Sequence, residues 1–271
     1  MNKGFVVLAQ NTTDVDYVSC AEELAVSLKN VMPDANITLI SNDVSMCNAF
    51  DNVVELPYGD LDPDGKWKLI NDWQVYEASP YEYTIKLEAD MYIPRSIEYY
   101  WDVLMQRDLV VSSTIRNFKN EIVKDQFYRQ FCVQNNLPNC YNALTYFKKS
   151  ETAKTFFEIV RDIFENWELY KKILKCKVTE EATTDWAYSI ASHIMGPEKT
   201  LMPNFTDFSM VHMKQHVNDL LTEKWANQLV YEFTSNGFKV NTFVQKYPFH
   251  YQNKEFVKSI KKYGSIQTNN I

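Results

Sequence analysis

Short apolar runs alternate with amphipathic stretches along most of the chain. Residues 5–9 form a fully apolar run, as expected for a parallel strand that is covered on both faces. Apolar residues recur at helical spacing over 18–28, and 37–40 and 53–56 follow as two further strands. This strand, helix, strand order predicts parallel strands joined by right-handed crossovers.

The strand predicted over 83–87 ends in two carboxylates. Apolar and polar positions alternate along it until Glu88 interrupts the pattern, and Asp90 follows shortly before Pro94. Ligands bind outside the carboxyl ends of strands in open α/β sheets, and two carboxylates one residue apart can face one hard cation. We therefore expect a metal and diphosphate site here, with a solvated polar turn as the alternative.

The alternation of strands and helices continues to about residue 219. It predicts helices over 66–78, 96–107, 151–174 and 184–195, and strands over 109–112, 142–147 and 208–211. Residues 114–125 are polar and lack periodicity, which predicts a loop, either mobile over a site or an ordinary surface excursion. The fold class is thus α/β, with a mainly parallel central sheet flanked by helices in one domain. Residues 1–219 form the expected core, and 220–271 an extension packed on it.

Composition narrows the class of protein. The 271 residues are 45% hydrophobic with a net charge of −7, so no basic footprint for general nucleic-acid binding is present. The cysteines are odd in number and lack metal-ligand spacing, which favours free thiols in a reducing compartment: Cys20, Cys47, Cys132, Cys140 and Cys176. We expect a cytoplasmic protein with no membrane partner, because no apolar run approaches a spanning length.

Five sequence blocks, in order over roughly 5–214, resemble the GT-A fold (Rossmann-like) nucleotide-sugar glycosyltransferases, specifically the retaining glycogenin-like group (family 8). The first block runs from Leu8 to Asn11 and continues with Tyr17. The resemblance implies that Leu8, Asn11 and Tyr17 bind the donor, with Asn11 and Tyr17 holding its nucleobase. A base can stack on the Tyr17 ring while Asn11 contacts its polar edge. In the second block, Lys68 resembles the lysine that the family sends towards the donor diphosphate.

The third and fifth blocks concern the metal. Glu88-Ala89-Asp90 is similar to the family's Asp-x-Asp motif, with Glu in place of the first Asp, so direct ligation by Glu88 stays open. The segment around His212 and Lys214 is similar to the family's late histidine and phosphate lysine. The resemblance thus implies Mn²⁺ or Mg²⁺ on Asp90, His212 and Glu88, and phosphate on Lys214. The family's Lys-Pro-Trp ending is absent, which leaves one competing pair, His250 and Lys254.

The fourth block concerns the sugar. Asn142 begins a strand that lines the sugar pocket in the family, although Leu144 stands where the family has glycine. Asp185 resembles the family's acidic residue beside the anomeric carbon, where it could interact with sugar hydroxyls or stabilise developing positive charge. An acid favoured by the helix dipole is the alternative interpretation of Asp185.

The resemblance implies a metal-dependent glycosyltransferase that moves a sugar from a nucleoside-diphosphate donor, expected to be a UDP-sugar, to a hydroxyl acceptor with retention. The default acceptor is a saccharide. The alternative is hydroxymethylcytosine-type DNA, as in small bacteriophage glycosyltransferases, with phosphate contacts from a C-terminal lysine cluster: Lys246, Lys254, Lys258, Lys261 and Lys262. A non-catalytic nucleotide-sugar-binding or partner-binding module is a further alternative. A dinucleotide-binding oxidoreductase is disfavoured, because no Gly-x-Gly-x-x-Gly follows the first strand.

Overall fold

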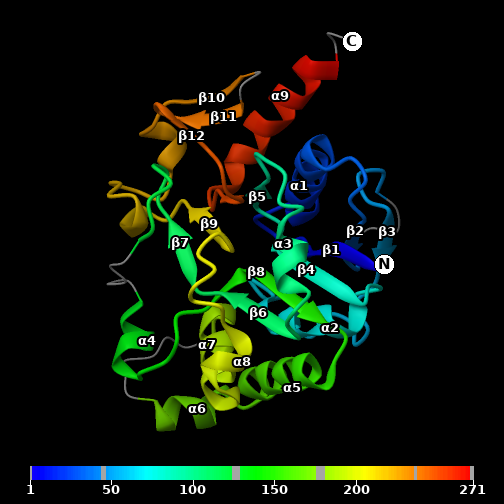
Figure 1. Cartoon of the computed structure of the whole chain (residues 1–271), viewed down its shortest axis with the longest axis vertical. Helices are drawn as coiled ribbons and strands as arrows, with labels where there is room; N and C mark the ends of the chain where they lie inside the picture. The colour runs from blue at the N-terminus through cyan, green and yellow to red at the C-terminus, as the bar shows by residue number, and fades with distance from the viewer. Residues whose placement is uncertain (1, 44–46, 124–128, 175–180, 235–236, 269–271) are drawn as a thin grey trace.

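A six-stranded sheet forms the centre of the molecule (Figure 1). The computed structural model describes residues 2–43, 47–123, 129–174, 181–234 and 237–268. Along the sheet the order is β3-β2-β1-β4-β8-β6. Its strands are β1 (Lys3–Leu8), β2 (Ile37–Ile40), β3 (Asn52–Val54), β4 (Tyr83–Glu88), β6 (Leu109–Ser112) and β8 (Tyr141–Lys148). β3, β2, β1 and β4 run parallel to one another, and β8 is antiparallel to both β4 and β6. The predicted mainly parallel α/β sheet is confirmed.

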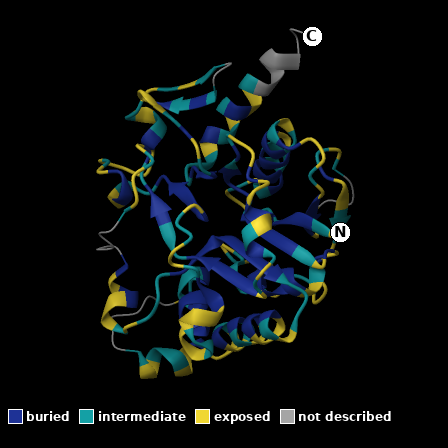
Figure 2. Cartoon of the chain, in the orientation of Figure 1, coloured by how far each residue is buried: buried dark blue, intermediate teal, exposed yellow. Residues whose placement is uncertain are grey.

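Helices cover both faces of this sheet, and its strands are almost wholly buried except for the edge strand β3 (Figure 2). Phe5 and Val7 of β1 pack into one core, and Val6 into the other, because successive side chains of a strand point to opposite faces. The first core contains helices α1 (Tyr17–Val31) and α3 (Tyr100–Leu104). The second contains the 3₁₀ helix η1 (Leu69–Gln74), α2 (Val75–Ala78), α5 (Glu151–Glu165) and α7 (Thr184–Met195).

A second sheet joins the C-terminal segment to the rest of the chain. Its order is β5-β13-β9-β7, with β5 (Met91–Tyr92), β7 (Thr114–Arg116), β9 (Ser209–His212) and β13 (Phe249–His250). β13 is antiparallel to β5 and parallel to β9. A late segment therefore lies directly beside the turn that carries the acidic pair. The predicted division between 1–219 and 220–271 stays a prediction.

The C-terminal part is completed by a β-meander and a helix at the top of Figure 1. β10 (Tyr231–Thr234), β11 (Gly237–Val240) and β12 (Phe243–Val244) pair antiparallel, and α9 spans Val257–Thr268. Other short helices are α4 (Gln130–Gln134), α6 (Trp167–Ile173), α8 (Pro197–Thr200), η3 (Gln215–Val217), η4 (Trp225–Asn227) and η5 (Lys254–Phe256).

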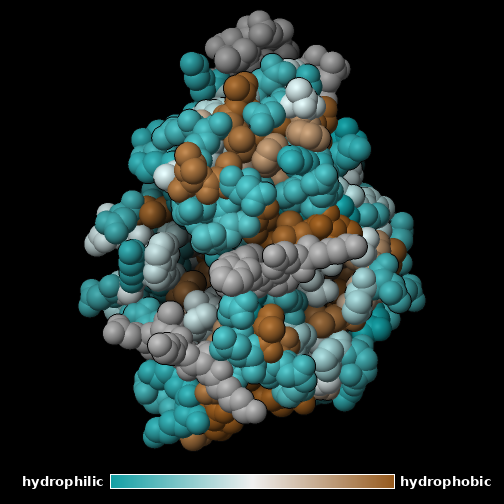
Figure 3. Space-filling view, turned by 90° about the vertical axis from the view of Figure 1, so that its left-hand side faces the viewer, coloured by the Kyte–Doolittle hydropathy of each residue, from teal (hydrophilic) through white to brown (hydrophobic). Residues whose placement is uncertain are grey.

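Hydrophilic residues predominate on the face seen in Figure 3, with hydrophobic residues between them. In the part of the chain that is described, no helix has the length and apolarity needed to cross a membrane.

Four predicted elements differ from the structure. The helix predicted over 66–78 begins only at Leu69 and consists of the 3₁₀ helix η1 followed by the short α2. The helix predicted over 151–174 divides at Asn166 into α5 and α6, and the one predicted over 96–107 shortens to α3. The loop predicted over 114–125 contains strand β7, and Arg116 forms an isolated bridge with Ile122. A three-residue strand is too short to show a period, so the pairing with β9 reveals it. Residues 124 and 125 lie outside the described part.

Candidate functional site

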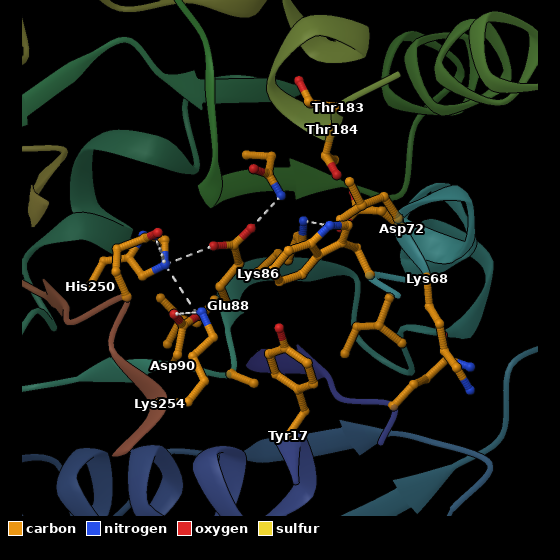
Figure 4. Close-up of a pocket in the computed structure, with 18 of the residues that line it drawn as sticks. Tyr17, Lys68, Asp72, Lys86, Glu88, Asp90, Thr183, Thr184, His250 and Lys254 are labelled. Atoms are coloured by element: carbon orange, nitrogen blue, oxygen red, sulfur yellow. Dashed lines mark hydrogen bonds and ion pairs between the residues drawn. The ribbon is translucent and has the colours of Figure 1, made fainter. Parts of the chain in front are cut away.

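A cavity of about 740 Å³ opens where the carboxyl ends of β1 and β4 meet the start of α7 (Figure 4). Ligand sites of open α/β sheets are expected at this edge. The cavity brings together seven of the residues predicted from the sequence: Leu8, Tyr17, Lys68, Glu88, Asp90, Asn142 and Lys214. Asn11, Asp185 and His212 are not among the residues that line it.

The acidic pair meets a histidine from the C-terminal segment. Glu88 is the last residue of β4, and Asp90 lies in the turn to β5. His250 Nε2 lies 3.1 Å from Glu88 Oε2 and 3.1 Å from Asp90 Oδ1. The pairing of β13 with β5 fixes this arrangement: His250 is opposite Met91, and the backbone N–H of Tyr251 donates to the Asp90 carbonyl at 3.1 Å.

Lys254 completes this charged group. Its Nζ lies 2.6 Å from Asp90 Oδ2, and the Asp90 side chain is only 5% exposed. Burial opposes ionisation of Asp90, but the charges of His250 and Lys254 outweigh it and hold the Asp90 pKa well below its usual range. Burial raises the pKa of Glu88, and the neighbouring charge of Asp90 adds to this while His250 opposes it. Asp90 is therefore the permanent anion of the pair.

The residues present fit a divalent metal ion. One ligand atom each from Glu88, Asp90 and His250 lie within 4.8 Å of one another, the one such group found among the described residues. Two carboxylate oxygens and one imidazole nitrogen form a mixed O/N set that suits Mn²⁺. Glu88, whose role the sequence left open, faces the same point as Asp90.

His212, predicted as the metal ligand, lies one strand away. It is opposite His250 in the register of β9 and β13, and its Nδ1 is 3.2 Å from His250 Nδ1. Burial, aided by the charge of His250, lowers the pKa of His212 well below its usual value. The structure therefore places His250, and not His212, against both carboxylates, while Lys214 lines the cavity. The pair that the sequence left as the competitor, His250 and Lys254, is the one in contact with Asp90.

Asp185 is linked to the site through Asn142. Its Oδ2 accepts from Arg129 at 2.5 Å, and its Oδ1 accepts from the backbone N–H of Asn142 at 2.9 Å. The Asn142 side chain in turn donates to Glu88 Oε1 at 2.7 Å. The catalytic role predicted for Asp185 stays a prediction, and its visible effect here is to position Asn142. Leu144, found where the family has glycine, is fully buried in β8.

The predicted nucleotide residues separate into two groups. Tyr17, the first residue of α1, lines the cavity, and burial raises its pKa to about 12. Lys254 Nζ lies 5.6 Å from the centre of the Tyr17 ring. Asn11 instead contacts the first turn of α1, where its Oδ1 accepts from the Val18 N–H at 3.0 Å, while the N-cap residue of this helix is Asp16.

Lys68 lines the cavity in an unusual backbone conformation. Its φ of 51° lies in the left-handed region, where residues other than glycine are strained. Its ammonium is 2.7 Å from Asp60 Oδ2, and Asp60 Oδ1 also accepts from Asn71 at 2.7 Å. The lysine predicted for the diphosphate is thus held by an acidic loop at the cavity wall.

Several residues of the cavity were missed by sequence reasoning. They include Gln10, Asp72, Lys86, Thr184 and Gln252. The sequence pattern did not reveal the burial of Lys86, because this residue occupies a polar position of an alternating strand, where a solvent-facing side chain is expected. Its ion-pair partner, Asp72, comes from a different element, so no local pattern could supply it.

Known proteins offer similarity in structure only. No protein-family model and no curated protein sequence matches this chain. Similar solved structures include the galactosyltransferase LgtC in complex with donor and acceptor sugar analogues, with 11% identity and a TM-score of 0.45 over 64% of this chain and 66% of LgtC. The glycosyltransferase GlyE of Streptococcus pneumoniae has 10% identity and a TM-score of 0.47, over 79% of this chain and 48% of GlyE. Mouse xyloside xylosyltransferase 1 has 9% identity and a TM-score of 0.46, over 74% of this chain and 85% of that protein. At this level of similarity, the chemistry has to come from the residues of the site itself.

Proposed function

We propose that this chain is a metal-dependent glycosyltransferase of the GT-A type that transfers a sugar from a UDP-sugar to a hydroxyl acceptor. One observation carries the proposal: Glu88, Asp90, His250 and Lys254 meet at one end of a cavity large enough for a nucleotide sugar. Two carboxylates and an imidazole suit a divalent cation, and the adjacent ammonium suits a phosphate. Tyr17 beside them supplies a face for a nucleobase.

The side chains of the cavity would act in two ways: some would supply charge to the metal and the leaving group, and others would orient the charged residues. Glu88, Asp90 and His250 would hold Mn²⁺ or Mg²⁺, and the bound ion would supply Lewis-acid stabilisation of the leaving diphosphate. Lys254 and Lys214 add positive charge where the leaving group gains negative charge. Asn142 orients Glu88 through its hydrogen bond. Retention at the anomeric carbon belongs to this proposal on the resemblance alone.

Release of nucleoside diphosphate tests the activity directly. We expect the protein to release UDP from one UDP-sugar in a panel of UDP-, GDP- and ADP-sugars, with Mn²⁺ or Mg²⁺ and no acceptor. Many glycosyltransferases transfer sugar slowly to water, so chelation of the metal with EDTA should abolish the signal. Tight binding of a nucleotide sugar without any release would instead favour the non-catalytic binding module.

The two candidate acceptors, a saccharide and modified DNA, can be distinguished by whether each one accelerates the release of UDP. A saccharide is the proposed acceptor, because the net charge of −7 disfavours a polyanionic partner. Addition of short oligosaccharides should therefore accelerate UDP release, while duplex DNA containing hydroxymethylcytosine should not. Stimulation by that DNA alone would establish the bacteriophage-type alternative.

The Tyr17 ring is proposed as the stacking surface for the base. Base stacking on an aromatic side chain is worth about 1–3 kcal/mol, so Tyr17→Leu should weaken UDP binding by about 10-fold. Tyr17→Phe keeps the ring and should retain most of the affinity. Isothermal titration with UDP in the presence of Mn²⁺ measures both. Equal affinities of the leucine and phenylalanine variants would exclude stacking on this residue.

A further inference from the structure

A second polar cluster lies in the same cavity, away from the proposed metal ligands. The Lys86 ammonium is ion-paired with Asp72 Oδ1, and the Tyr188 hydroxyl donates to Asp72 Oδ2 at 2.7 Å. These residues come from β4, η1 and α7. Lys86 and Asp72 line the cavity, whereas Tyr188 lies behind them. Figure 4 shows Asp72 on the side opposite His250, with Lys86 between them.

This ion pair is nearly withdrawn from water. The side chain of Lys86 is 1% exposed and that of Asp72 is 10% exposed. A buried ion pair is weak evidence for stability, because well-packed apolar residues of similar volume often do as well or better. Its position in a cavity wall is therefore better explained by a ligand than by folding.

The cluster has unused hydrogen-bonding capacity. An ammonium carries three donors, and within the described part of the chain the only hydrogen-bond acceptor of Lys86 is Asp72. The Tyr188 ring lies 5.3 Å from Lys86 Nζ and covers one side of it. Each oxygen of Asp72 accepts one bond from this cluster and has a second lone pair. Donors and acceptors side by side are what a pair of neighbouring sugar hydroxyls needs.

The surroundings favour a neutral ligand group. The charges of Lys86 and Asp72 cancel, and Glu88 follows Lys86 by two residues on the same face of β4. Thr183 and Thr184 at the start of α7 line the cavity above Lys86 and Glu88 (Figure 4). An added carboxylate would meet Asp72 and Glu88, and like charges in a partly buried site repel. Neutral hydroxyl groups would not be repelled by the carboxylates of Asp72 and Glu88.

We propose that Asp72 and Lys86 bind hydroxyl groups of the transferred sugar and select a neutral sugar over an acidic one. This inference rests on the proposed function, since it assigns part of the donor to the remaining end of the same cavity. It predicts that Asp72 and Lys86 contribute to the binding of the sugar part of the donor and not to the binding of its nucleotide part.

The test compares the affinities for UDP and for a neutral UDP-sugar. The probe is the tightest-binding of UDP-glucose, UDP-galactose and UDP-N-acetylglucosamine, measured by isothermal titration with Mn²⁺. The double variant Lys86→Met with Asp72→Asn removes both charges together, because either single change leaves one buried charge unpaired. We expect its affinity for the UDP-sugar to fall by about 10-fold or more and its affinity for UDP to change less than about threefold.

Lys149→Met is the matched control. The half-buried Lys149 donates to the carbonyl of Tyr76 on the same side of the sheet, and it does not line the cavity. This variant should lose stability but keep the ratio of the two affinities. Thermal unfolding of both variants shows that they are folded at the temperature of the titration.

The outcomes separate this inference from the proposed function. An unchanged affinity ratio in the folded double variant would overturn the assignment of Asp72 and Lys86 while leaving the glycosyltransferase proposal intact. Tighter binding of UDP-glucuronic acid than of UDP-glucose by the unaltered protein would overturn the selection for a neutral sugar. Failure of the unaltered protein to bind UDP would overturn the proposed donor, and this inference with it.

Discussion

Replacing Asp90 by alanine is expected to abolish metal-dependent turnover of the donor and to leave the fold intact. Asp90 contacts two basic residues of the cavity and stays ionised. Its carboxylate contacts His250 at 3.1 Å and Lys254 at 2.6 Å, and its low pKa keeps it charged. Without it, the proposed metal ligands lose their permanent anion. We expect a loss of at least about 100-fold in kcat, comparable to the loss of other groups that stabilise developing charge.

The measurement is release of UDP from the active donor across a series of Mn²⁺ concentrations. Asp90→Asn keeps the shape of the side chain and should show a similar loss, which separates charge from packing. Asp102→Ala changes an exposed aspartate of α3 and serves as the control for handling and folding. Turnover at the level of the unaltered protein in Asp90→Ala would disprove the metal site.

His250→Ala is expected to weaken binding of Mn²⁺ by about 100-fold or more, and His212→Phe by about 10-fold. The first change removes a proposed ligand atom, His250 Nε2. The second removes the imidazole whose Nδ1 lies 3.2 Å from Nδ1 of His250, on the ring atom that does not face the carboxylates. Loss of a residue that orients a metal ligand typically costs 10-fold to 100-fold in affinity, so the direct ligand should cost at least the upper end. Both chains should still bind UDP in the absence of metal.

Electron paramagnetic resonance of free Mn²⁺, titrated with protein and UDP, measures this difference without relying on turnover. His193→Ala, which replaces an exposed histidine of α7, is the control for loss of an imidazole elsewhere. A larger loss in the His212 variant than in the His250 variant would restore the ligand set first indicated by the sequence.

Sequence patterns predicted the strands and helices of the core, because the apolar and polar positions of each element repeat with a period of a few residues. The helix over 184–195 was predicted with the bounds that the structure has. Alternation along 83–87 placed the two carboxylates at the carboxyl end of β4, and the run at 5–9 identified β1. Elements that are too short to show a periodic pattern were predicted poorly: β7 was predicted to be a loop, and α3 was predicted to be longer than it is.

The partners of those carboxylates were decided only by tertiary structure. His212 and His250 are 38 residues apart, and both stand at the ends of short strands. Local pattern gives no reason to choose between them. The register of β13 between β5 and β9 turns His250 towards Glu88 and Asp90, and hydrogen bonds between distant segments set that register.

The same reason explains the second cluster of the cavity. Asp72, Lys86 and Tyr188 come from three elements that meet only after the helices pack on one face of the sheet. By itself the sequence determined a mainly parallel α/β sheet and the position of an acidic pair at its edge, because these depend on local periodicity. Which histidine, which lysine and which buried ion pair line the cavity depended on long-range strand register and helix packing, which no local window of the sequence contains.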